Sequence, residues 1–467
     1  MEKRIRIRMV PKSQTGASIK NHFGHLSSST LSDFAPNPEN SRRALIKAGD
    51  LGIEASETEG KNLNGFIALK DFQKVFGVDL KEKKFASKLA ERVVTKESFM
   101  TPKVELNVPA ELANDIDFVY VPTPPLFFGL DPVPPQASVY HLRVEDVARI
   151  IRAYRCHRQG WTGRGVRLAM ADSGFARHPF FDLYDFNVTR ITTPSTSSPE
   201  VDTSGHGTGE SANALVIAPD CQFFGIKHDD YSAEALETSL AQNPKVITNS
   251  WGWDIDNQNL NSLQTNDPNL YNELVDVERI IKDAIDSGVT VIFSAGNGHR
   301  AFPGCMPDVI SAGGTTVSAT GELSASSYAS SFVSKFYPSR NTPDFCGIVG
   351  ESGTAPLKGH IMLPVPSGCE LEGDNMTPAQ SNSGWGIFSG TSAAAPQIAG
   401  VVALMLSVNP NLKPAEIKGI LSSTATDVKK GKTAHGETAK VGKDLATGSG
   451  LVNALNACLR AQQLLNP

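Results

Sequence analysis

Three short motifs place a carboxylate, an imidazole and a hydroxyl among small residues. The carboxylate is Asp172 in ADSG, the imidazole is His206 in GHGTG, and the hydroxyl is Ser392 in SGTSAAAP. A serine hydroxyl is a weak nucleophile until an imidazole accepts its proton, and a carboxylate fixes the tautomer of that imidazole and stabilises its cationic form. If the fold brings these side chains together, the sequence predicts acyl-transfer chemistry at Ser392.

Each motif also has a purely structural interpretation. Asp172 precedes Gly174 and can be a turn residue, and His206 can cap a helix. Ser392 stands where the apolar run APQIAGVVALML begins, so it can be an N-cap, although the same helix start offers N–H groups that favour negative charge. The joint occurrence of the three favours catalysis, and the structural interpretation stays open for each residue.

The elements that must position these residues alternate along the chain. Short apolar runs end in small or polar residues in GVRLAMADSG, CQFFGIK, KVITNSWG and GVTVIFSAGNG, and helical stretches such as ELVDVERIIKDAIDSG lie between them. Continuous rather than alternating hydrophobicity with intervening helices indicates a parallel sheet covered on both faces. Sites in such folds lie at the carboxyl ends of the strands, where these polar residues occur.

The N-terminal quarter has a different pattern. RIRIRMV, KVELNV and DIDFVYV favour strands, SRRALIKAGDLG favours a helix, FIALKDFQKVFG predicts a strand that runs into a helix, and the lysines of DLKEKKFASK suggest a solvated helix face. Six prolines between 122 and 135 indicate an extended linker. We therefore expect an α+β domain at 1–121, a Pro-rich linker at 122–140 and a larger domain at 141–463.

Composition excludes several classes of partner. The chain has 467 residues, of which 40% are apolar and 20% charged, and a net charge of -5, so nothing favours nucleic acid or an anionic membrane. The apolar runs are shorter than a membrane span. Because MEKRIRIRMVPK lacks the apolar core of a signal peptide, we expect a cytoplasmic protein with free thiols. Cys346 and Cys369 are candidates for a disulfide only if the protein is exported.

The motifs together resemble those of the subtilisin-like serine peptidases, the subtilases or peptidase S8 family. The resemblance rests on ADSG, GHGTG, NSWG at 249–252, SAGNG around Asn297 and SGTSAAAP, with further matches in MPDVISAGGTTV and ATGSGLVNA. It covers roughly 145–460, and the motifs occur in the family's order. The resemblance implies an α/β fold, with a subtilisin-like parallel sheet flanked by helices on both faces, and here a small N-terminal α+β domain.

The resemblance also implies the activity of a serine endopeptidase that acts on polypeptides without a required cofactor. Ser392 would attack the scissile carbonyl, His206 would act as general base and then as general acid, and Asp172 would orient His206. Asn297 and the backbone N–H of Ser392 would form the oxyanion hole. We expect an apparent pKa of about 6–7 for a base of this kind.

Substrate binding is implied at two further places. Ser250, Trp251 and Gly252 in NSWG would form an edge to which an extended peptide adds as a strand, and Ala295 and Gly296 would line the pocket for the side chain before the cut. Many subtilases bind calcium on loops, but no D-x-D-x-D-G loop occurs and the acidic residues are dispersed, so the sequence supports no metal ligands.

Several features depart from the family pattern or leave alternatives. The residues after HGT read GESANALVIAP instead of the family's second histidine, and 331–385 looks like an insertion between the last sheet strands and the serine. A catalytically silent subtilase fold, whose N-terminal domain selects a partner, is the main alternative function. An esterase is a weaker one, because α/β-hydrolases place the serine first. The segment 1–121 is either a pro-domain that binds the active site in cis or a permanent regulatory domain.

Overall fold

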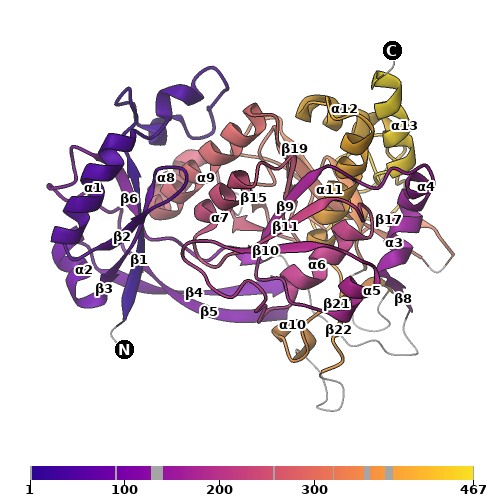
Figure 1. Cartoon of the computed structure of the whole chain (residues 1–467), viewed down its shortest axis with the longest axis horizontal. Helices are drawn as coiled ribbons and strands as arrows, with labels where there is room; N and C mark the ends of the chain where they lie inside the picture. Colours follow the sequence, from indigo (N-terminus) through magenta and orange to yellow (C-terminus); the bar gives the residue numbers. More distant parts are fainter. Residues whose placement is uncertain are drawn as a thin grey trace.

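The structure is a computed structural model. It describes residues 3–89, 92–127, 140–255, 258–318, 320–351, 358–373 and 382–465. An N-terminal unit, residues 3–121, lies at one end of the molecule, apart from the hairpin of β4 (Leu80–Leu89) and β5 (Arg92–Pro102), which extends toward the middle (Figure 1). The last helix, α13 (Ala454–Leu465), lies at the other end. A large central sheet with its helices fills the space between them.

The central sheet has eight strands within the described residues, in the order β10-β11-β9-β12-β14-β16-β17, with β20 also paired to β16. All of these pairs are parallel except β16 with β17. The strands are β9 (Arg167–Asp172), β10 (Val188–Thr192), β11 (Gln222–Lys227), β12 (Val246–Asn249), β14 (Thr290–Ser294), β16 (Ile310–Val317), β17 (Leu323–Ala325) and β20 (Phe345–Ile348). The predicted α/β fold class is confirmed.

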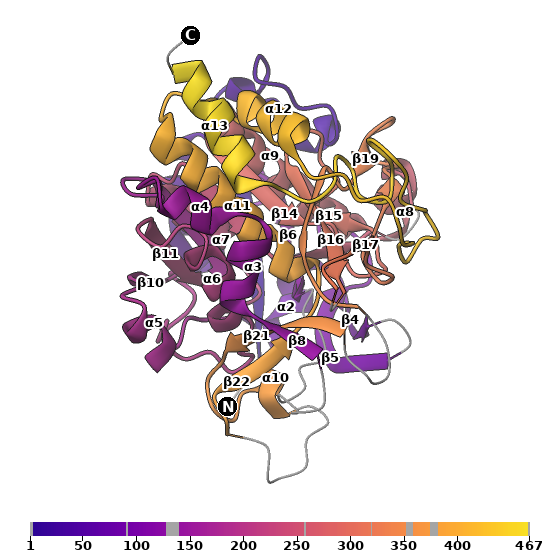
Figure 2. The ribbon, with the colours of Figure 1, turned by 90° about the vertical axis from the view of Figure 1, so that its right-hand side faces the viewer.

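Helices cover both faces of this sheet. In β9, Leu168 and Met170 point into one core, while Ala169 and Ala171 point into the other. The first core also holds α6 (His206–Leu215) and α11 (Thr391–Val408), and α11 packs on α13, which packs on α4 (Ala153–His157) beside α3 (Val144–Ile150) (Figure 2). The second holds α7 (Ser232–Ala241) and α9 (Pro268–Asp286). Burial on both faces explains the continuous apolar strands.

The N-terminal unit has a four-stranded antiparallel sheet in the order β2-β3-β1-β6. Its elements are β1 (Arg4–Pro11), α1 (Pro38–Asp50), β2 (Glu54–Glu57), β3 (Leu63–Ala68), α2 (Leu69–Phe76) and β6 (Ile116–Tyr120). It has its own core around Ile7 and Leu112, but Phe23, Phe118 and Tyr120 belong to the core under α9. The unit is therefore packed firmly onto the rest of the chain.

Two local expectations are wrong. DLKEKKFASK forms β4 (Leu80–Leu89), which makes a hairpin with β5 (Arg92–Pro102), because pairing with a second strand decides between helix and strand where periodicity is ambiguous. KVELNV forms no strand. After residue 143 the chain forms two short helices, α3 and α4, which are separated near Arg152, whose φ of 67° lies in the left-handed region.

The segment 331–385 is not an insertion after the last sheet strand. Part of it is β20, which extends the central sheet beside β16. Another part is β21 (Lys358–Pro364), which pairs with β22 (Trp385–Phe388) and with β8 (Tyr140–Arg143). Residues 352–357 and 374–381 lie outside the described residues. The sequence analysis missed β20, because only two of its four residues, Phe345 and Ile348, strongly favour a strand.

The predicted linker is only partly within the described residues, because 128–139 lie outside them. The described part contains β7 (Leu126–Phe127), which pairs antiparallel with β13 (Trp251–Asp254). The linker therefore begins with a strand that is bound to the larger part of the chain.

Candidate active site

Asp172 and His206 are joined by a direct hydrogen bond. Asp172 is the last residue of β9, and His206 is the first residue of α6, after Gly205 in a left-handed conformation with φ 86°. The Nδ1 atom of His206 lies 2.7 Å from Oδ1 of Asp172, and both side chains are buried. The carboxyl end of a strand and the start of a helix thus place a carboxylate where it can orient an imidazole.

The surroundings of His206 change its pKa in opposite directions. Burial lowers the pKa, but the charge and the hydrogen bond of Asp172, with smaller contributions from Glu210 and Asp202, raise it to about 9. This pKa lies above the expected value of about 6–7, because the three carboxylates and the hydrogen bond of Asp172 together raise it by more than burial lowers it.

Asp202, which the sequence analysis missed, holds the start of α6 in place. Its carboxylate accepts hydrogen bonds from the backbone N–H groups of Gly205 and Thr208, each at 2.9 Å. It also accepts from the hydroxyls of Thr208 at 2.6 Å and of Ser173 at 2.8 Å, next to Asp172. Asp202 lies three residues before Gly205, the N-cap of α6, so the usual N-cap signal does not identify it.

Ser392 is the second residue of α11, and it is completely buried. The N-cap position is taken by Gly390, so the interpretation of Ser392 as an N-cap is wrong. The Ser392 hydroxyl donates to the carbonyl of Ser250 at 3.4 Å, and the Ser250 hydroxyl donates to the carbonyl of Ser392 at 2.9 Å. Ser250 thereby connects the start of α11 to the loop between β12 and β13.

Helices α6 and α11, which begin at His206 and next to Ser392, pack against each other. Two glycines permit close approach around α6. A Cβ on Gly207 would lie 2.3 Å from the carbonyl oxygen of Gly174, and one on Gly400 would lie 2.7 Å from Ile217. The candidate base and the candidate nucleophile are therefore carried by two helices in direct contact.

Asn297 lies at the start of α11 as well. Its Oδ1 accepts hydrogen bonds from the backbone N–H of Thr391 at 2.9 Å and from the Thr391 hydroxyl at 3.0 Å. The Thr391 hydroxyl also accepts from the N–H of Gly296 at 3.1 Å. Because the oxygen of the carboxamide faces Thr391, the nitrogen is the atom on its other side, so the Asn297 amide can serve as a donor. The sequence analysis missed this role of Thr391.

The expected substrate edge is occupied by another part of the chain. Trp251 and Gly252 in β13 pair with Phe127 and Leu126 in β7. The Trp251 indole is buried and donates to the carbonyl of Ala171 at 2.8 Å, so the side chain belongs to the core while the backbone forms the edge.

Ala295 and Gly296 follow β14 and are the two residues expected to line a substrate pocket. Ala295 is buried and donates its N–H to the carbonyl of Ala312, and Gly296 has a φ of 109°. A Cβ on Gly296 would lie 2.7 Å from the carbonyl of His299. The turn after β14 therefore requires glycine at this position.

Metal and disulfide chemistry have no counterpart in the described part of the chain. There, no group of three or more His, Cys, Asp or Glu side chains could hold a metal ion. The six cysteines are free thiols and buried. Cys346 donates to the carbonyl of Thr447 at 3.5 Å, whereas Cys369 lies near Gly205, so the two have different surroundings.

Among the described helices, α11 alone is long and apolar enough to span a membrane, and 89% of that stretch is buried.

Comparison with known proteins finds one matching family and several relatives of the chain. The model of the subtilase family matches residues 163–442. Alkaline elastase YaB from Bacillus sp. (strain YaB) is 24% identical over 415 residues, which cover 83% of this chain and 92% of the relative. Subtilisin E from Bacillus subtilis (strain 168) is 26% identical over 59% of this chain and 64% of its own length.

A solved structure is similar over almost the whole chain. Fervidolysin from Fervidobacterium pennivorans, described as a keratinolytic enzyme related to subtilisin, superposes with a TM-score of 0.57 at 17% identity, over 98% of this chain and 61% of its own. The expected cytoplasmic location is contradicted, because the relatives, including Subtilisin Savinase from Lederbergia lenta, are secreted subtilisins.

Proposed function

Because the chain belongs to the subtilase family and is a serine endopeptidase, we propose that Asp172, His206 and Ser392 are its catalytic triad. Subtilases act on polypeptides and need no cofactor for catalysis. The observation that carries the assignment is the 2.7 Å hydrogen bond between Asp172 and His206, on a helix packed against the helix that carries Ser392.

In the proposed mechanism, Ser392 Oγ attacks the scissile carbonyl while His206 Nε2 accepts its proton. Asp172 holds the Nδ1–H of His206 and stabilises the imidazolium. The amide nitrogen of Asn297 and the N–H of Ser392 donate to the oxygen that becomes negative. His206 then returns the proton to the leaving amine, and water repeats the sequence to release the acyl group.

A fluorophosphonate probe tests this assignment. We expect the probe to label the protein at Ser392, and we expect Ser392→Ala to abolish both labelling and peptide hydrolysis. Ser422→Ala is the control, because that exposed hydroxyl contacts only Ser449 in the described hydrogen bonds and should not affect labelling. Labelling that persists in Ser392→Ala would refute the triad. Absence of labelling in every form would favour the silent binding module.

For the domains, we propose the division 1–121, 122–140 and 141–463, with the first part bound to the active site in cis. The pairing of β7 with β13 supports this, because it places the chain after the N-terminal unit along the edge where a substrate strand would add. Just before β7, Thr123 donates its hydroxyl to Glu273 at 2.6 Å, and Val121 donates its N–H to Asn269 at 3.0 Å. Both contacts anchor the segment to α9.

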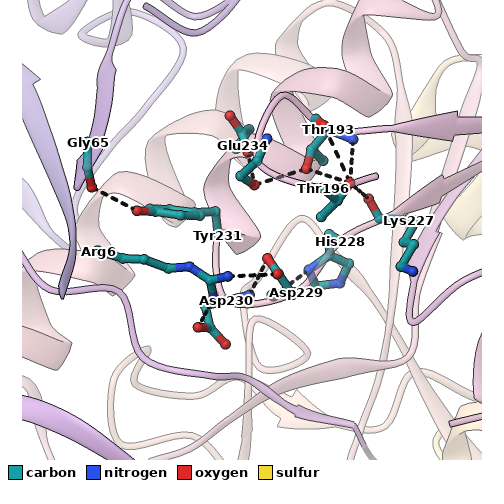
Figure 3. A network of polar contacts seen from close by, with 11 residues as sticks. Arg6, Gly65, Thr193, Thr196, Lys227, His228, Asp229, Asp230, Tyr231 and Glu234 are labelled. Atoms are coloured by element: carbon teal, nitrogen blue, oxygen red, sulfur yellow. Dashed lines mark hydrogen bonds and ion pairs between the residues drawn. The ribbon is translucent and has the colours of Figure 1, made fainter. Parts of the chain in front are cut away.

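Ion pairs hold the N-terminal unit on α7 and α9. Arg6 reaches Asp230 and, at 2.9 Å, Asp229, and the Tyr231 hydroxyl donates to the carbonyl of Gly65 at 3.1 Å (Figure 3). Arg8 is buried and contacts Asp276 at 2.7 Å and Glu237 at 3.0 Å. These contacts orient the unit so that the segment after its last strand, β6, runs to β13.

Self-processing tests the proposal. We expect wild-type protein to shorten to a fragment that begins between 120 and 145, Ser392→Ala to stay full length, and added 1–121 to inhibit the trimmed enzyme. A full-length wild type with high activity that does not respond to added 1–121 would make the unit a permanent accessory domain.

A further inference from the structure

Helix α6 carries a buried carboxyl group that the proposed mechanism does not use. Glu210 is completely buried and stands four residues after His206, so the two side chains lie on the same face of the helix, about one turn apart. It falls within GESANALVIAP, where the sequence departs from the family pattern. A buried carboxyl beside a catalytic histidine requires a physical explanation.

Glu210 begins a chain of buried hydrogen bonds that connects the two helices of the site. Asn213 donates to Glu210 Oε2 at 2.8 Å, and Gln397 in α11 donates to Asn213 Oδ1 at 3.2 Å. Gln397 also bonds both the N–H and the carbonyl of Ile348 in β20, each at 2.7 Å. The chain therefore ties α6 to α11 and both to the central sheet.

The hydrogen bonds between the two helices do not explain why residue 210 is a carboxylic acid. Within the described residues, Glu210 Oε1 has no hydrogen-bond partner. A glutamine would fill the same space and accept the same bond from Asn213 without the cost of a buried charge. Burial raises the pKa of Glu210 to about 7, against the lowering effects of His206 and Asn213, so the group becomes negative at mildly alkaline pH.

The groups that act on the histidine come from three elements. Asp172 acts from β9, Asp202 from the loop before α6, and Glu210 from α6 itself. The charged groups that act on Glu210 are His206 and Asp172. Asn213 and Gln397, which contribute the hydrogen bonds between α6 and α11, carry no charge.

We propose that Glu210 is a positioning residue for His206, a second carboxylate that stabilises the imidazolium and, through Asn213 and Gln397, fixes the histidine helix against the serine helix. The inference rests on the proposed triad. Asp172 forms a direct hydrogen bond with the histidine. Glu210 acts on the histidine through its charge, across the buried interior, and does not contact substrate. Because the two groups interact, they titrate as a pair.

The pH dependence of kcat/KM distinguishes this role from a merely structural one. Loss of the second negative charge should make His206 easier to deprotonate, so we expect Glu210→Gln to shift the acid limb by about one pH unit to lower pH. Glu210→Asp keeps the charge and should restore the limb toward that of wild type. Glu200→Gln, which removes an exposed carboxylate, is the control and should not shift it.

Titration of the His206 ring by NMR in a Ser392→Ala background gives a readout that needs no activity. A lower His206 pKa after Glu210→Gln supports the proposal even if the protein proves inactive, so its failure is distinguishable from failure of the proposed function. An unchanged His206 titration in a folded Glu210→Gln variant would overturn it. So would a loss of kcat with an unchanged acid limb, since this indicates packing alone.

Discussion

At the scale of single residues, the pKa of His206 determines the pH range in which the proposed catalytic site can act. The general base must be neutral before it accepts a proton from Ser392, whereas the pair with Asp172 favours the charged form and raises the pKa to about 9. With His206 as the proposed base, the ion pair that orders the site also shifts the expected activity to alkaline pH.

We therefore expect kcat/KM to rise with pH toward an inflection at about 9, as His206 loses its proton. The effect on stability has the opposite sign. Because the folded pKa is raised, the pair stabilises the fold fully below about pH 6.5, and this contribution is lost as pH rises through about 9. Activity profiles and urea unfolding between pH 5 and 10 measure both. A flat activity profile over this range would contradict the assignment of His206.

Asn297 offers a second test at this scale. Asn297→Ala removes the donor from the proposed oxyanion hole, so kcat should fall by about 10²–10³-fold, the size of the effect that is known from subtilisin itself, with little change in KM. Steady-state kinetics on a peptide substrate measure the two constants. Thr391→Val removes one of the two bonds that orient the Asn297 carboxamide and should give a smaller loss of kcat. A change in KM alone would argue against this role.

At the scale of elements, the contact between α6 and β9 fixes the geometry of the proposed triad. Gly207 lies where a Cβ would come within 2.3 Å of the Gly174 carbonyl and 2.9 Å of the Asp172 Cβ. Backbone cannot move aside as a flexible side chain can, so the helix that carries His206 depends on glycine at this position.

Gly207→Ala should push α6 away from β9, with loss of most activity and a lower melting temperature. Gly419→Ala is the matched control, since Gly419 lies in helix α12 (Pro414–Thr424) with no atom within 4 Å of the added Cβ. That change should be neutral or stabilise the protein by about 0.4–1 kcal/mol, because alanine restricts the unfolded chain. Thermal unfolding of both variants tests the prediction. Equal changes in melting temperature would contradict it.

At the scale of the whole molecule, the N-terminal unit and the rest of the chain share buried charges and a hydrophobic core. Phe23 from the unit packs edge-on against Tyr271, at 5.0 Å between ring centroids, and also contacts Phe302 and Phe336. Arg8 adds an ion pair with Asp276 in which both side chains are at most 1% exposed. The attachment of the unit therefore combines apolar burial with charges that must stay paired.

Arg8→Ala should leave Asp276 buried without its main partner and lower the free energy of unfolding by about 3–5 kcal/mol. Arg4→Ala removes an exposed pair with Glu54 and should cost at most about 1 kcal/mol. Urea unfolding in the Ser392→Ala background, which we expect to prevent self-digestion, measures both. Similar values for the two variants would show that the Arg8 ion pair does not stabilise the assembled chain.

The sequence by itself determined the fold class, the family and the positions of the motifs. Apolar runs that end at Asp172 and near Asn297 indicate buried parallel strands, because burial on both faces leaves a local trace in every strand. The motifs around His206 and Ser392 are equally local, since small residues must lie next to each reacting group. These features can be read from neighbouring residues alone.

The tertiary structure alone decided what depends on residues far apart in the chain. Only the packing of α6 on α11 connects Glu210 with Gln397, and only the pairing of β7 with β13 brings the start of the linker to the proposed substrate edge. The sequence pattern of β4 suggested a helix. Pairing with β5, which the local pattern does not reveal, selects the strand conformation instead. Hydrogen bonds and burial between distant segments set these outcomes, and no local pattern encodes which segments will meet.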